Sequence, residues 1–255
     1  DEVIALASEA ANRGKLYSTH MRDVSDYSIS LFGSVEETIS IGRLSGVRVQ
    51  ISHLKCVGPA TWGNAGELLD RIDRARAEGL DVAADQYPYT AASTAITGAL
   101  FPRWAQVGGR TTTLTNLSGK EFYTRLLEGI RQNYVRRGAA DRVVVANHPS
   151  NRDLEGLSMV QVAEKMNCDT AEAAIRLYRA NETSVILHAM EESDVEVIAG
   201  GRWVAVGSDG TSIKAKGTLS IGRPHPRSYG TFPRFLARYV REKRIVPLEE
   251  AIRKM

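Results

Sequence analysis

Residues 47–55, with the sequence VRVQISHLK, decide the fold. The stretch follows Gly46, is apolar at alternate positions, and becomes polar where it ends, at His53 and Lys55. A short apolar run of this kind is typical of a strand that is buried on both faces of a parallel sheet. Because α/β barrels carry their chemistry where the strands end, we expect a functional site just after this strand.

A similar pattern occurs about thirty residues earlier in the chain. A helical stretch at 1–11 leads to a strand at 15–19, which is followed by His20 and Arg22. His20 and His53 would then occupy equivalent places on neighbouring strands. Either histidine alone is compatible with an ordinary core or helix-capping imidazole, but the pair in register favours a shared metal or catalytic site.

The composition excludes several classes of protein. The 255 residues are 43% hydrophobic, which is enough for a large core and suits one α/β domain. The net charge of +3 is spread along helix faces among acidic residues, so we expect no nucleic-acid partner. Cys56 and Cys168 have no CxxC spacing, which predicts neither disulfides nor a thiolate zinc site and favours a cytoplasmic location. No apolar run approaches the roughly 20 residues that span a membrane.

The chain alternates strand-like and helix-like segments, which predicts repeated βα units in a single domain. Residues 90–117 are irregular and rich in Thr, Gly and Pro, so we expect an insertion around 90–157. A loop is expected at 217–230, which is rich in Gly and Pro. The expected strands are 15–19, 47–52, 80–85, 142–146, 183–187 and 203–206, and the expected helices are 1–11, 35–45, 65–78, 120–136, 158–166, 170–180, 192–199, 232–242 and 248–255.

Three candidate site residues, His20, His53 and Asp209, follow expected strands and would converge at one face of a barrel. Two imidazoles and a carboxylate suit a hydrolytic divalent ion such as zinc. The spacing alone is not specific, since no local motif such as HExxH is present. Asp209 lies in the sequence SDG and is equally compatible with an ordinary turn aspartate.

Five motifs, in this order, resemble the N-acyl-D-amino-acid deacylases, or D-aminoacylases, of the amidohydrolase superfamily. The resemblance covers nearly the whole chain and implies a metal-dependent TIM barrel with a small β-sandwich. The motifs are STHMRD at 18–23, QISHLKCVG at 50–58, DQYPYTAAST at 85–94, VGSDG at 206–210 and RPHPRSYGTFPR at 223–234.

The resemblance also implies roles for individual residues. It makes His20 and His53 ligands of a tightly bound zinc ion, and it makes Asp209 the catalytic aspartate, which can also bind metal. A second, weaker metal site is expected in the complete protein. Lys55, Tyr87 and Arg227 match residues that contact the carboxylate end of the substrate.

The chain departs from the family pattern in two respects. It contains no His-x-His motif, and the bridging metal ligand and the sandwich strands of the family would lie outside it. We therefore expect the C-terminal half of a (β/α)8 barrel, from the helix before strand five to the helix after strand eight. As an internal fragment it would be inactive by itself.

The activity that the resemblance implies for the complete protein is zinc-dependent hydrolysis of N-acyl-D-amino acids, which releases a carboxylate and a free D-amino acid. Two alternatives stay open: an amidohydrolase acting on cyclic amides, of the dihydroorotase or hydantoinase type, and a non-catalytic half-barrel that binds a ligand or partner. Other residues have lesser expectations: His148 as a loop or capping residue, His188 as a residue that faces the site, His225 as a residue that shapes the loop before Arg227, and Cys56 as a small buried hydrophobe.

Overall fold

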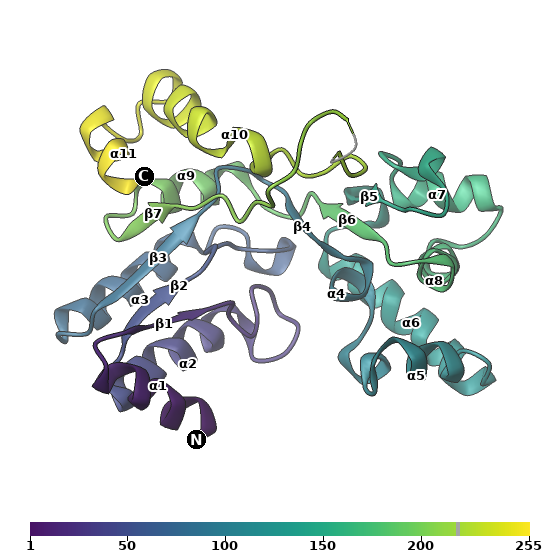
Figure 1. Ribbon diagram of the computed structural model, residues 1–255, viewed down its shortest axis with the longest axis horizontal. Coiled ribbons are helices and arrows are strands. Elements are labelled where there is room, and N and C mark those ends of the chain that lie inside the picture. Colours follow the sequence, from purple (N-terminus) through teal and green to yellow (C-terminus); the bar gives the residue numbers. More distant parts are fainter. Residues whose placement is uncertain (218–219) are drawn as a thin grey trace. The chain divides into compact units, whose positions relative to one another are not determined.

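The computed structural model describes residues 1–217 and 220–255, which form two compact units (Figure 1). Unit 1 consists of Asp1–Thr90, Met190–Thr211 and Pro226–Met255. Unit 2 consists of Ala91–Ala189 and Ser212–His225. All of the candidate metal, catalytic and substrate residues named from the sequence belong to unit 1.

Unit 1 is built on a parallel sheet with the strand order β1-β2-β3-β7. The register pairs Thr19 with Ile51, Ile51 with Ala84, and Gln86 with Val206, so the carboxyl ends of the four strands lie along one edge. These strands match the predicted ones within two residues and confirm the α/β class with a parallel sheet. Their bounds are Leu16–Thr19 for β1, Arg48–Ile51 for β2, Val82–Gln86 for β3 and Val204–Val206 for β7.

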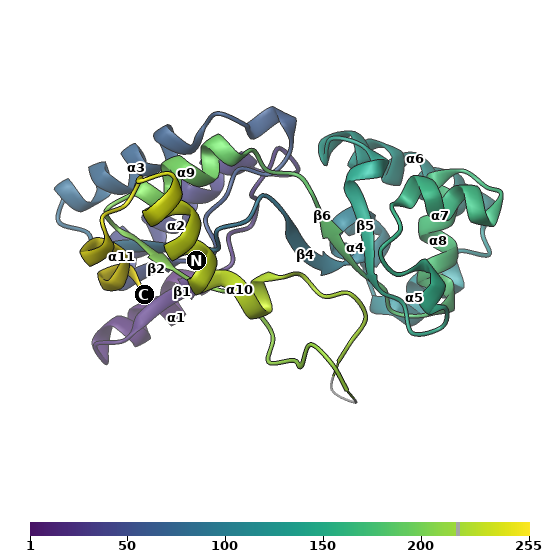
Figure 2. The same ribbon diagram turned by 90° about the horizontal axis from the view of Figure 1, so that it is seen from above.

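Helices connect these strands, and α2, α3 and α9 lie alongside one another against the sheet (Figure 2). Helix α3 buries Leu68, Ile72 and Ala75, which form the apolar stripe expected from the sequence. Helix α2 begins five residues before the predicted 35. The helices of unit 1 are α1 (Glu2–Asn12), α2 (Ser30–Ser45), α3 (Ala65–Ala77), α9 (Glu192–Gly200), α10 (Arg227–Arg234) and α11 (Leu248–Lys254), with a π-helix at Phe235–Glu242 and a 3-10 turn at Pro59–Thr61.

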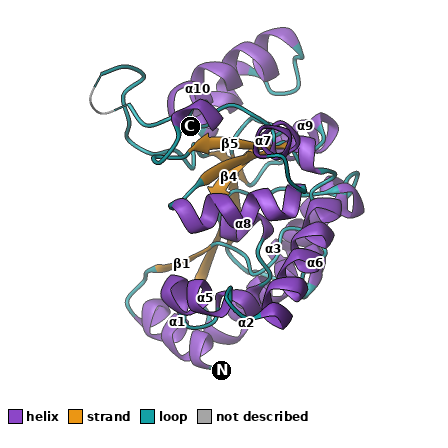
Figure 3. Cartoon of the chain, turned by 90° about the vertical axis from the view of Figure 1, so that its right-hand side faces the viewer, coloured by secondary structure: helices purple, strands orange, loops and turns teal. Residues whose placement is uncertain are grey.

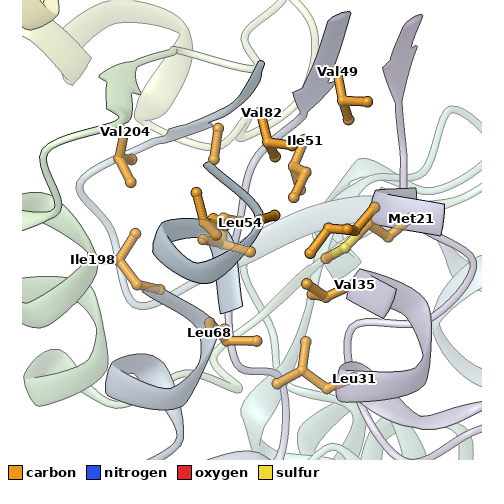
Figure 4. Close-up of a cluster of buried hydrophobic side chains, with 14 of the residues drawn as sticks. Met21, Leu31, Val35, Val49, Ile51, Leu54, Leu68, Val82, Ile198 and Val204 are labelled. Carbon is orange, nitrogen blue, oxygen red and sulfur yellow. The ribbon is translucent and has the colours of Figure 1, made fainter. Parts of the chain in front are cut away.

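The main core of unit 1 lies between the sheet and these helices (Figure 4). Ile51 and Val82 of the strands and Leu68 of α3 are fully buried in it, as is Leu54, which follows β2. Complete burial of one such side chain contributes about 1.5 to 3 kcal/mol. This packing fixes the strand ends that carry the candidate site.

Unit 2 contains a second, antiparallel sheet with the strand order β4-β6-β5, and most of the rest of it is helical (Figure 3). Its strands are β4 (Ala92–Ala95), β5 (Val143–Asn147) and β6 (Ser184–Leu187). Its helices are α4 (Ile96–Leu100), α5 (Gly109–Asn116), α6 (Lys120–Arg136), α7 (Met159–Met166) and α8 (Thr170–Ala180), with 3-10 turns at Arg103–Gln106, Ala140–Arg142 and Arg152–Leu154.

The structure of unit 2 differs from the prediction in the direction and pairing of its strands. The strands expected at 142–146 and 183–187 exist, but they pair antiparallel in their own sheet, so the expectation of one continuous βα series was wrong. The apolar runs indicate buried strands and carry no information on strand direction. The stretch at 90–117, expected to be irregular, contains β4, α4 and α5, and the expected loop at 217–230 gives way to helix α10 at Arg227.

Within the part of the chain that the structure describes, the parallel sheet has four strands. Closure of a (β/α)8 barrel therefore stays a prediction. None of the described helices combines the length and the apolar character needed to cross a membrane.

Candidate active site

The carboxyl ends of β1 and β2 bring His20 and His53 together, as the register of the two strands predicts. The Nδ1 atom of His20 lies 2.6 Å from the Nε2 atom of His53, and the ring planes meet at 78° with their centroids 4.5 Å apart. His53 is buried, whereas His20 is exposed. A ring nitrogen of each histidine is therefore directed at the other.

The backbone at His53 has a conformation that is rare for a residue with a side chain. Its φ angle is 44°, in the left-handed region, which costs roughly 1 to 2 kcal/mol for residues other than glycine. On either side the chain is held by strand-like hydrogen bonds: the N–H of Ser52 donates to the carbonyl of Thr19, and that of Leu54 donates to the carbonyl of Asp85. Conformations of this kind cluster at functional sites.

Both histidines are held neutral. Burial, together with the nearby Lys55 cation and smaller electrostatic effects, lowers the pKa of His53 to about 3. Partial burial and the Lys55 cation also lower the pKa of His20, opposed by the Asp209 carboxylate. Neutral imidazoles keep the lone pairs that a metal ion requires.

Lys55 is buried beside the two rings. Its Nζ atom donates to the backbone carbonyl of His53 at 2.9 Å and lies 2.7 Å from the Nδ1 atom of the same residue. The ammonium also lies 5.7 Å from the centroid of the Tyr87 ring, within the range of a cation–π interaction. Lys55 thus places a positive charge between His53 and Tyr87.

A second cluster contains Tyr87, Asp209 and Arg227. Tyr87 follows β3, Asp209 follows β7 with a φ angle of 45°, and Arg227 is the first residue of α10. The guanidinium of Arg227 lies 4.8 Å from the ring centroid of Tyr87, and its Nη1 atom is 2.7 Å from Oδ2 of Asp209. Burial raises the pKa of the Tyr87 phenol above its usual value, against an opposing effect of Arg227, so the phenol is neutral.

The structure thus brings His20 and His53 together but gives the Asp209 carboxylate a different neighbour, Arg227. Among residues 1–217 and 220–255, no three side chains of His, Cys, Asp or Glu are arranged to hold a metal ion. Two facing, neutral imidazoles do suit zinc, which normally takes at least three protein ligands. The positions of His20 and His53 are compatible with two nitrogen ligands of a zinc site, and ligation by these histidines and by Asp209 stays a prediction.

The remaining histidines have structural environments within unit 2. His148 is buried, with Nδ1 2.8 Å from the hydroxyl of Thr183. His225 is also buried, and its Nε2 donates to the carbonyl of Ala91, which fits its expected part in shaping the chain before Arg227. His188 is exposed, and its backbone pairs with Arg142.

Cys56 lies one residue beyond Lys55 in unit 1 and is buried. Burial raises the pKa of its thiol to about 12, which keeps it protonated. This is the environment of a small hydrophobe, as expected from the sequence, and not that of a thiolate ligand.

Sequence reasoning assigned no role to Asp85, although Asp85 opens the motif DQYPY at the end of β3. Its Oδ1 atom accepts the backbone N–H of His53 at 2.8 Å, and its Oδ2 atom accepts from Nε2 of Gln50, also at 2.8 Å. Asp85 could have been identified from the sequence as a carboxylate at the end of a strand that leads to the site.

Comparison with known proteins identifies sequences and solved structures that are similar to this chain. No family model matches it. It is 35% identical to N-acyl-D-glutamate deacylase and 30% identical to D-aminoacylase, both from Alcaligenes xylosoxydans xylosoxydans, over its whole length but only 42% of theirs. Among solved structures it matches N-acyl-D-glutamate deacylase from Bordetella bronchiseptica, crystallised with zinc and a phosphonate mimic of the tetrahedral intermediate, with a TM-score of 0.74 and 30% identity. The match covers the whole chain and 43% of that structure.

A D-aminoacylase structure that represents a subset of the amidohydrolases matches with a TM-score of 0.71 and 29% identity. The chain thus shares its α/β fold with amidohydrolases. Within that class, the chain is similar over its whole length to the N-acyl-D-amino-acid deacylases, and it spans about two-fifths of the length of these relatives.

Proposed function

We propose that this chain supplies part of the active site of a zinc-dependent hydrolase that cleaves the amide bond of N-acyl-D-amino acids, releasing a carboxylate and a free D-amino acid. The observation that carries the proposal is the pair of neutral ring nitrogens of His20 and His53, which face each other at 2.6 Å. The two cations beside that pair, Lys55 and Arg227, support a substrate with a carboxylate.

His20 and His53 would hold the zinc ion through Nδ1 and Nε2, the nitrogen atoms that face each other. When bound, zinc supplies a Lewis acid that polarises the amide carbonyl and acidifies water. A further ligand is needed to complete the usual set of three. Relatives more than twice as long support the view that the complete gene product supplies it.

Asp209 is the proposed general base and acid. Its carboxylate accepts a proton from the attacking water and returns it to the amine nitrogen, which would otherwise leave as an unstable anion. The carboxylate lies close enough to His20 to affect the pKa of that histidine. Its position beyond β7 therefore agrees with a role beside the two ligands.

Arg227 and Lys55 would bind the α-carboxylate of the substrate, with Arg227 able to do so through two parallel hydrogen bonds. Arg227 is paired with Asp209, and the α-carboxylate would take the place of Asp209 beside the guanidinium. Substrate binding would in this way release the base. Tyr87 supports the guanidinium with its ring face and helps to exclude water.

The test uses the complete product of the gene, loaded with zinc, and measures release of free amino acid. N-acetyl-D-glutamate, N-acetyl-D-aspartate and N-acetyl-D-leucine are compared with their L enantiomers and with a hydantoin. We expect turnover of at least one D substrate and none of the L enantiomers. Turnover of the hydantoin alone would favour a cyclic-amide hydrolase, and no turnover at all would favour a binding module.

A further inference from the structure

We propose that Asp85 is a positioning residue, whose carboxylate holds the left-handed turn at His53 and so directs the His53 ring toward His20. The inference rests on the proposed function, since it treats His53 as a metal ligand. It adds a residue to the site for which the sequence motifs gave no role.

Asp85 accepts hydrogen bonds from residues that lie before, at and after His53 in the sequence. Oδ1 accepts the N–H of His53 at 2.8 Å, and Oδ2 accepts from the side chain of Gln50 at 2.8 Å. The backbone carbonyl of Asp85 accepts the N–H of Leu54 at 2.7 Å. One residue thus holds β2, the turn at His53 and the residue after it.

The turn needs such an acceptor because the strand ladder ends before it. Strands β2 and β3 pair in register as far as Ile51 and Ala84. With a φ angle of 44°, His53 turns out of the strand, and its N–H points to a carboxylate instead of a strand carbonyl. A hydrogen bond to an ionised acceptor is roughly twice as strong as one to a neutral acceptor, so it suits a conformation that is otherwise unfavourable.

Strand β7 provides an independent observation. A Cβ atom placed on Gly207 would lie 2.8 Å from Oδ1 of Asp85, so a side chain at this position would displace the carboxylate. The N–H of Gly207 donates to the carbonyl of Gln86, which fixes this close approach. Asp85 therefore lies between the end of β2, which carries His53, and the segment after β7, which leads to Asp209.

The experiment measures the zinc dissociation constant of this chain by competition with a chelator, with thermal unfolding as the check of the fold. Asp85→Ala and Gly207→Ala are expected to weaken zinc binding by about tenfold or more, in the range of losses for residues that orient metal ligands. Asp85→Asn should remain within about threefold of wild type, because its amide oxygen still accepts the His53 N–H. Asp81→Ala, which removes an exposed carboxylate just before the same strand, should have no effect.

A second measurement does not depend on metal. Hydrogen exchange of the His53 amide, followed by NMR in the zinc-free chain, should be at least tenfold faster in Asp85→Ala than in wild type and unchanged in Asp81→Ala. If wild type binds no zinc, the proposed function fails for this chain while this measurement still decides the positioning role.

Wild-type zinc affinity together with unchanged His53 exchange in Asp85→Ala would overturn the inference. If Asp85→Ala does not fold, Gly207→Ala decides by the same two readouts, because it displaces the carboxylate without removing it.

Discussion

His53 and Asp209 share a left-handed backbone, with φ angles of 44° and 45°, although neither is glycine. Glycine at either position would avoid the energetic cost of the left-handed conformation, but it would also remove the imidazole or the carboxylate. Strained backbone that keeps a reactive side chain is typical of functional sites. At the scale of single residues, this observation agrees with the chemical roles proposed for the two side chains.

The sequence allowed the pairing of His20 with His53 to be predicted, because both follow neighbouring parallel strands and strand register is set by the apolar pattern. It did not predict the ion pair between Asp209 and Arg227. That contact depends on where helix α10 begins, and Pro226 and Gly230 in the sequence favoured a loop there.

Asp209→Asn tests the proposed proton transfer. The asparagine keeps the size and much of the hydrogen bonding of Asp209 but cannot accept the proton, so kcat of the zinc-loaded gene product should fall by about 10² or more. Zinc content should change little, since His20 and His53 are untouched. Steady-state kinetics and metal analysis on the same preparation give both numbers, and undiminished kcat would remove Asp209 from the catalytic role.

Lys254 gives a prediction on pH and stability. It is buried, donates to the backbone carbonyls of Gly201 and Val204, and has its pKa lowered to about 8, chiefly by burial. Between pH 8 and about 10.5 the unfolded chain binds more protons at Lys254 than the folded chain. The contribution of Lys254 to stability therefore rises as pH rises through this window.

The measurement is urea unfolding at pH 7.5 and 9.5 for wild type, Lys254→Met and the exposed control Lys15→Met. The stability of wild type relative to Lys254→Met should increase with pH, by on the order of 1 kcal/mol. The same comparison with Lys15→Met should show no such trend. A constant difference for Lys254→Met would mean that the lysine is charged or neutral to the same extent in both states.

At the scale of elements, the contact between α2 and β2 depends on a glycine. A Cβ atom on Gly42 of α2 would lie 2.6 Å from Cγ2 of the buried Val49 in β2. Alanine is favoured over glycine in a helix by about 1 kcal/mol, while overpacking costs about 1 to 3 kcal/mol. Gly42→Ala should therefore leave the protein less stable, with the clash outweighing the gain in helix propensity.

Two further variants make this prediction specific. Gly66→Ala in α3 adds a Cβ that meets no atom within 4 Å, so it should stabilise the protein by up to about 1 kcal/mol. Val49→Ala combined with Gly42→Ala should cost less than the sum of the single changes, because each offsets the volume of the other. Urea unfolding measures all of these, and a stabilising Gly42→Ala would contradict the close packing of α2 on β2.

The elements also show where prediction from sequence stopped. Strands β2, β3 and β7 were found because each is a short apolar run before polar residues, and β1 because a strand-like stretch followed by a histidine repeats the pattern of β2. Strand β4, with the sequence ASTA, was missed because it has no large apolar side chain. Strands β5 and β6 were found but assigned to the wrong sheet, since partner and direction depend on tertiary contacts that the local pattern does not encode.

At the scale of the whole molecule, the number of proposed metal ligands limits the zinc affinity and the activity that we expect of this chain by itself. Within residues 1–217 and 220–255, the facing pair His20 and His53 provides the two nitrogen ligands that we propose, and no set of three potential ligands converges. Strands β1 and β7 form the edges of the parallel sheet, and Leu16 on β1 and Leu6 on α1 are exposed. An unpaired edge beside exposed apolar side chains favours association between chains.

We therefore expect the 255-residue chain, expressed by itself, to bind zinc weakly, to self-associate as its concentration rises, and to hydrolyse no N-acetyl-D-amino acid. Two ligands fall short of the three that tight zinc sites use, and a missing ligand lowers affinity for the metal before it affects any chemistry. Zinc stoichiometry after dialysis, analytical ultracentrifugation and amino-acid release measure the three properties. The complete gene product is the positive control, and His20→Ala should abolish the residual zinc binding.

The opposite result would be equally informative. A monomeric chain that holds one zinc ion tightly and releases D-amino acids would require a third ligand within these 255 residues. Asp209 is then the first candidate, because the Coulomb effect of its carboxylate reaches His20. Asp209→Asn would in that case lose zinc as well as activity, which separates a metal ligand from a proton carrier.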